Sequence, residues 1–88
     1  MSSREYLATI SILIKDRKIH ASDVNNLLTE KGDIILARLG LNGKNIDIKN
    51  CSGFITIVVK SNLKEIKDLN KKLDGLYGIV AKLNIMNN

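Results

Sequence analysis

The chain has 88 residues, and its 14 Lys or Arg against 9 Asp or Glu give a formal net charge of +5 at pH 7. This length allows one hydrophobic core and predicts a single domain over residues 1–88. The one cysteine, Cys51, excludes an internal disulfide and a zinc site made of several thiolates from one chain. The positive charge is compatible with nucleic acid, anionic metabolites or simple solubility, and does not choose among them.

The single cysteine favours a cytoplasmic location as the default, and the N-terminal residues predict no membrane segment. The apolar run at 6–14 is shorter than the ~20 residues that cross a bilayer. No small-residue cleavage site follows it, so we expect no secretion.

The first half of the chain predicts strand, helix and strand. Apolar alternation over 6–14 predicts a strand. Asp16 is the predicted N-cap of a helix, and a glycine in the left-handed conformation, Gly32, is expected to end it. The apolar stripe of this helix consists of Ala21, Val24, Leu27 and Leu28. Residues 33–41, apolar on both faces except for Arg38, predict a second strand.

The second half predicts strand, helix and strand again. Asn and Gly residues over 42–53 indicate the longest connection, in which "GLNGK" fits a hairpin-type turn better than a phosphate loop because no helix follows. The run "FITIVV", 54–59, is the clearest strand. Ser61 or Asn62 is the expected cap of a second helix, and 78–86 predict the last strand. The apolar stripe of that helix is Leu63, Ile66, Leu69 and Leu73.

The order β-α-β-β-α-β predicts an α+β fold, the ferredoxin-like sandwich. Two split βαβ units place the first and third strands in the centre of a four-stranded antiparallel sheet, with both helices on one face. The strands carry apolar residues on both faces, and two helices cover only one. We therefore expect self-association, as a dimer or tetramer, through the uncovered face or a strand edge.

Catalytic and metal-binding chemistry has little support in the residue types. His20 is expected to be a solvent-exposed helix residue and Cys51 a part-buried loop thiol, and nothing in the sequence brings them together. An acylphosphatase-like enzyme of this fold would need a phosphate-binding loop, which the sequence lacks. We predict no enzyme activity, no metal and no cofactor.

Nucleic-acid binding is the alternative function. RNA-recognition domains share this strand order and stack bases on aromatics of the central strands. Tyr6 lies at the very start of the first strand, and Phe54 is expected in the core. The alternative site is Lys67, Lys71 and Lys72 on the second helix, although Glu65, Asp68 and Asp74 interrupt these lysines and favour an ordinary solvated face.

Several segments together resemble the iron-only hydrogenase system regulators, an ACT-like family related to the ligand-sensing half of nickel-responsive repressors. The segments are "IKDR" (14–17), "VNNLL" (24–28), "GDIILARLG" (32–40), "FITIVV" (54–59) and "LNKKLDGLYGIVAK" (69–82). The resemblance implies a self-associating, non-catalytic regulatory or sensor module in bacterial hydrogen metabolism. Its partners would be a second copy of itself and a small-molecule effector or a partner protein.

The resemblance also implies where a ligand would bind. ACT domains bind small molecules where the loop after the first strand meets a neighbouring subunit, and that loop usually reads Asp-Arg-Pro-Gly. Asp16 and Arg17 match this pattern, whereas Lys18 and Ile19 replace its Pro and Gly, which weighs against an amino-acid ligand. The candidate ligand-binding residues are Asp16, Arg17, Arg38 and Gly40.

Overall fold

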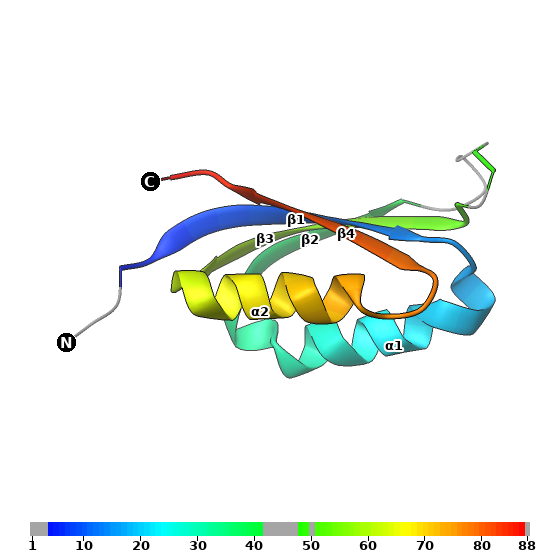
Figure 1. The fold of residues 1–88 in the computed structure, drawn as a ribbon, viewed down its shortest axis with the longest axis horizontal. Coiled ribbons are helices and arrows are strands. Elements are labelled where there is room, and N and C mark those ends of the chain that lie inside the picture. Colours follow the sequence, from blue (N-terminus) through cyan, green and yellow to red (C-terminus); the bar gives the residue numbers. More distant parts are fainter. Residues whose placement is uncertain (1–3, 42–47, 50, 88) are drawn as a thin grey trace.

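The computed structural model describes residues 4–41, 48–49 and 51–87. Within these residues the chain forms the predicted alternation of strands and helices (Figure 1). The elements are β1 (Tyr6–Ile14), α1 (Arg17–Glu30), η1 (Gly32–Ile34), β2 (Ile35–Leu41), β3 (Gly53–Ser61), α2 (Leu63–Asp74) and β4 (Ile79–Ile85). The predicted turn in "GLNGK" falls largely on 42–47, which lie outside the described residues.

The four strands form one antiparallel sheet in the order β2-β3-β1-β4. The first and third strands are therefore central, as predicted. Both helices lie under the same face of this sheet, and no described segment covers the other face, which we call the uncovered face (Figure 1). The ferredoxin-like sandwich is confirmed.

The hydrophobic core lies between the sheet and the two helices. In β1 and β3 every second residue is buried, and the register pairs buried residues across the strands, such as Ile10 with Ile57 and Ile12 with Ile55. Because the side chains of a strand alternate between its two faces, this pattern directs one apolar set toward the helices. The helices contribute Val24, Leu28, Ile66, Leu69 and Leu73.

Asp16 caps α1 as predicted, because its side chain accepts a hydrogen bond from the Lys18 backbone N–H at 3.1 Å. The helix ends at Lys31-Gly32, as predicted, but the expected left-handed glycine is wrong. Lys31 is the C-cap, with φ −103°, and Gly32 begins the short 3₁₀ helix η1 instead of adopting the left-handed conformation. The second strand consequently starts at Ile35 rather than at residue 33.

Asn62 caps α2 by accepting a hydrogen bond from the Glu65 backbone N–H at 2.9 Å. Ser61, the other predicted candidate, donates its hydroxyl to the Glu65 carboxylate at 2.9 Å. Glu65 is thus held from both its backbone and its side chain, so the first turn of the helix is fixed to the end of β3.

Two expectations about single residues are wrong. His20 is buried, with 9% of its surface exposed, and its ring packs edge-on against Tyr77 with centroids 5.5 Å apart. Phe54 pairs with Leu13, whose side chain lies on the sheet face opposite the core, so Phe54 is a half-buried residue of the uncovered face. Cys51 is partly buried, as expected, and its thiol donates to the Gly53 carbonyl at 3.6 Å.

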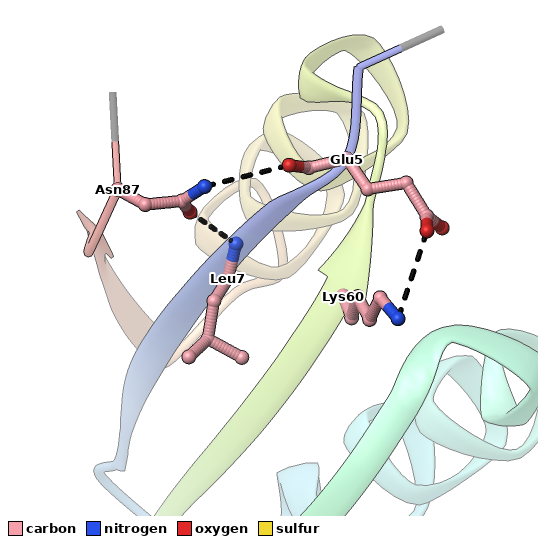
Figure 2. Close-up of polar contacts among 4 residues, drawn as sticks. All are labelled: Glu5, Leu7, Lys60 and Asn87. Carbon is pink, nitrogen blue, oxygen red and sulfur yellow. Dashed lines mark hydrogen bonds and ion pairs between the residues drawn. The ribbon is translucent and has the colours of Figure 1, made fainter. Parts of the chain in front are cut away.

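The two ends of the described chain meet beside β1 (Figure 2). The Asn87 side chain accepts a hydrogen bond from the Leu7 backbone N–H at 2.6 Å and donates one to the Glu5 carbonyl at 3.5 Å. Lys60 forms an ion pair with Glu5 at 3.6 Å, with both side chains more than half exposed. Solvent screens such a pair, so the amide contacts of Asn87 contribute more to holding the start of β1.

Candidate ligand-binding site

A pocket of about 310 Å³ lies between α1 and the neighbouring strands β2 and β3. Helix α1 contributes Arg17, Ala21 and Asn25, which follow one another at four-residue spacing and therefore share one face of the helix. Strand β2 contributes Arg38, Gly40 and Leu41. The remaining lining residues are Ile14, Gly53, Phe54 and Ile55.

Arg17 is held at the corner where β1 passes into α1. Its backbone N–H donates to the Ser52 hydroxyl at 2.6 Å, and the Ser52 N–H donates to the Ile14 carbonyl at 2.9 Å. The aliphatic part of Arg17 lies over Gly53, where an added Cβ would be 3.0 Å from Arg17 Cγ. Gly53 therefore provides the space that the Arg17 side chain occupies.

Arg38 reaches the same pocket from the edge strand β2. It pairs with Ile57, a core residue, so its side chain leaves the sheet on the helix side. There its Nη2 donates a hydrogen bond to Asn25 Oδ1 on α1. The contact joins the edge strand to the helix across the pocket.

The structure brings three of the four predicted ligand residues together. Arg17, Arg38 and Gly40 line the pocket, whereas Asp16 lines an adjoining hollow of about 470 Å³ that shares Arg17 and Ala21 with it. The carboxylate of Asp16 caps α1. Sequence reasoning missed Asn25 and Gly53, because their role depends on how α1 lies over the strands. The spacing Arg17, Ala21, Asn25 was the available signal.

The lining of the pocket has a net positive charge. Among the described residues that line it, Arg17 and Arg38 are charged and none carries a carboxylate. In the part of the chain that the structure describes, the ion pair found is that of Lys60 with Glu5, outside the pocket. Both guanidinium groups thus keep their charge available for a bound molecule.

The lysines of the nucleic-acid alternative do not form one uniform surface. Lys71 and Lys72 line a groove between α1 and α2 together with Asp23 and Glu30, whereas Lys67 is not among its lining residues. The acidic side chains reduce the positive potential that nucleic acid would meet. Binding through these three lysines stays an untested prediction, and the groove does not favour it.

The uncovered face of the sheet carries an apolar row that crosses all four strands. The registers place Leu41 beside Phe54, Phe54 beside Leu13, and Leu13 beside Val80. The next row is mostly polar and consists of Leu39, Thr56, Ser11 and Lys82. Single apolar residues such as Leu39, Val58 and Leu7 lie further along the face, but only the first of these two rows is apolar throughout. We refer to Leu41, Phe54, Leu13 and Val80 as the apolar row.

Over residues 4–41, 48–49 and 51–87, no cluster of three His, Cys, Asp or Glu side chains is arranged to hold a metal ion. Over the same residues, no helix has the length and apolarity needed to cross a membrane.

Comparison with solved structures supports the assignment of the fold. CPII from Thiomonas intermedia K12, a nitrogen regulatory PII-like protein, aligns in its apo form with a TM-score of 0.54 and 13% identity over 94% of this chain and 90% of that chain. The uncharacterized protein TM1266 from Thermotoga maritima aligns with a TM-score of 0.83 and 25% identity over 96% of this chain and 100% of that chain. These likenesses define a ferredoxin-like protein.

The family model "TM1266-like: Iron-only hydrogenase system regulator, putative" matches residues 6–83. The chain therefore belongs to this family, as the resemblance in its sequence predicted. No curated protein matches the sequence significantly.

Proposed function

We propose that this protein is a non-catalytic, cytoplasmic regulatory module of the iron-only hydrogenase system that associates with itself and senses a small molecule. Family membership supports the regulatory role. The candidate sensing site contains Arg17, Arg38 and Gly40, with Asp16 at its margin. A partner protein at the same surface is the other form of input that this role allows.

The apolar row is the observation that carries self-association. Leu41 is 52% exposed, and Phe54, Leu13 and Val80 are only partly buried, although all four belong to regular strands. A second copy would cover this row with its own, because a two-fold axis brings the same patch of both subunits together. The occupant we propose is therefore another copy of this chain.

Light scattering coupled to size exclusion tests this proposal through Leu13→Glu. Leu13 lies in a central strand, and a carboxylate there would be buried between the two copies without a partner, which is costly. We expect the wild type to be a dimer or tetramer at micromolar concentration and Leu13→Glu to be a monomer.

Ile19→Glu is the matched control, because Ile19 is 65% exposed on α1, away from the row. The same change of side chain at this position should leave the oligomer intact. A monomeric wild type, or equal dissociation by both variants, would refute association through the apolar row. Circular dichroism of each variant confirms that the comparison is made between folded proteins.

A further inference from the structure

The side of β2 that faces the helices differs from the same side of the other strands. On β1, β3 and β4 the buried positions are filled by Ala, Ile and Val, except for Gly53 and Ser61 at the two ends of β3. On β2 the two positions paired with the core residues Ile57 and Ile55 are Arg38 and Gly40. Opposite them, α1 presents small or polar residues rather than large apolar ones. The chain therefore does not fill this part of the interface with apolar side chains.

Nothing in the described part of the chain requires a glycine at position 40. A Cβ added there would meet only Ile55 Cγ1, at 4.0 Å, which is ordinary contact. Gly40 does not have a positive φ, and glycine weakens the interior of a strand compared with alanine. The missing side chain instead enlarges the pocket beside Arg38.

Within the described residues, the groups that hold the two arginines in place are uncharged. The Asn25 amide is uncharged, so its contact with Arg38 orients the guanidinium and leaves the full positive charge. A guanidinium has five N–H donors, and among the described residues Arg38 donates one hydrogen bond, to Asn25. The Arg17 side chain is oriented through its packing over Gly53.

We propose that this pocket binds the oxyanion group, carboxylate or phosphate, of a small metabolite between Arg17 and Arg38, and that Asn25 is a positioning residue for Arg38. Guanidinium groups match the geometry of both oxyanions through paired hydrogen bonds. A volume of about 310 Å³ suits a small metabolite. The inference rests on the proposed sensing function and assigns the chemical class of its ligand.

Titration of the ¹⁵N-labelled, full-length protein followed by NMR tests the inference. The probes are inorganic phosphate and succinate at constant ionic strength, with neutral succinamide as the uncharged counterpart of succinate. We expect saturable shifts of the backbone amides of Arg17, Asn25 and Gly40 with at least one of the two anions. The anion that binds with the lower dissociation constant identifies the oxyanion group, carboxylate or phosphate, that the site prefers. Succinamide should produce no saturable shift.

Charge variants separate a specific site from general attraction. Arg38→Gln and Arg38→Lys should each weaken binding about tenfold or more. Glutamine removes the charge, whereas lysine keeps the charge but cannot form the paired hydrogen bonds of a guanidinium. Lys64→Gln removes one charge from an exposed position on α2 outside the pocket, and it should leave the affinity unchanged. An equal loss in Lys64→Gln would refute a defined site.

Substitutions at two further positions test whether Asn25 positions Arg38 and whether the ligand needs the space left by Gly40. Asn25→Asp keeps an acceptor for Arg38 but adds a carboxylate that competes with the ligand, so it should weaken binding more than Asn25→Ala. A purely structural role for Asn25 predicts the opposite order. Gly40→Ala should weaken binding while the protein stays folded, whereas Gly32→Ala, where an added Cβ meets nothing within 4 Å, should not.

Leu41 and Phe54 belong to both the pocket and the apolar row, but this experiment and light scattering have distinguishable outcomes. The absence of saturable shifts with both anions would overturn the oxyanion site and leave self-association standing. Saturable binding to a monomeric wild type would retain the oxyanion site and overturn association through the apolar row.

Discussion

At the scale of single residues, the most constrained contact in the molecule is that between Gly78 and His20. Gly78 has φ +77°, a conformation that is strained for any residue with a Cβ. An added Cβ would overlap Cδ2 and Nε2 of the His20 ring. The backbone N–H of Lys15 also donates to the Gly78 carbonyl at 2.9 Å, so the turn before β4 is joined to the end of β1.

Gly78→Ala should therefore destabilise the fold through two separate effects. The left-handed backbone and the overlap with His20 together predict a loss of about 2–4 kcal/mol in the free energy of unfolding. Urea denaturation followed by circular dichroism measures this loss. Gly32→Ala, with open space around the added Cβ, should change stability by less than about 0.5 kcal/mol.

A double-mutant cycle with His20→Ala separates the two effects. Removing the ring relieves the overlap but not the backbone strain. The loss in free energy of unfolding in the double mutant should therefore be smaller than the sum of the two single losses, by at least about 1 kcal/mol. Strict additivity would show that His20 does not occupy the space beside Gly78.

The burial of His20 shows where sequence reasoning fails at this scale. Residue type alone favours an exposed histidine on a helix. The spacing of His20, Val24 and Leu28 places all three on one buried face, so the pattern contained the correct answer. The environment of the ring could still not be predicted, because Tyr77 and Gly78 contact it from 57 and 58 positions later in the chain.

At the scale of elements, the junction between β3 and α2 has two side-chain contacts that can be tested. Asn62 accepts a hydrogen bond from the Glu65 backbone N–H. Without that acceptor the amide at the helix start loses its partner, so Asn62→Ala should cost about 1 kcal/mol of stability. Asn62→Asp keeps the acceptor and adds a negative charge at the positive end of the helix dipole, so it should be neutral or stabilising.

Thermal unfolding monitored by circular dichroism distinguishes these outcomes. Asn62→Asp should melt at or above the melting temperature of the wild type. Asn62→Ala should melt about 4–8 °C below the wild type. Identical melting temperatures for wild type and Asn62→Ala would indicate that the Ser61–Glu65 contact alone fixes the helix start.

The elements differ in how well their sequence specified them. β1 was predicted residue for residue, since its alternation is uninterrupted. β2 was predicted two residues too early, because Asp33 and Ile34 continue an apolar-rich run. In the structure the Ile34 N–H donates to the Lys31 carbonyl, and Ile34 is buried in the core through η1. The local hydrogen bond and the burial of Ile34 outweighed strand propensity.

At the scale of the whole molecule, the candidate site shows what sequence can supply and what only packing can. Arg17, Arg38 and Gly40 were named in advance, through a family resemblance. Asn25 was not, since its contact with Arg38 exists only because α1 runs beneath the edge strand. The uncovered face was foreseen from counting helices and strand faces. Its apolar row was not, because that depends on the register joining Leu41 to Val80 through two other strands.

Self-association through the apolar row makes the stability of the molecule depend on its concentration. Association binds the folded state and not the unfolded state. A higher protein concentration therefore shifts the unfolding equilibrium toward the folded, associated protein by mass action. For a dimer of this size, a hundredfold increase in protein should raise the melting temperature by about 5–10 °C. Calorimetry from a few micromolar to a few hundred micromolar would measure this shift. The Leu13→Glu variant should melt at one temperature throughout, and Ile19→Glu should follow the wild type. A wild-type melting temperature independent of concentration would show that folding and association are not coupled, and that the apolar row stays exposed to solvent in the native protein.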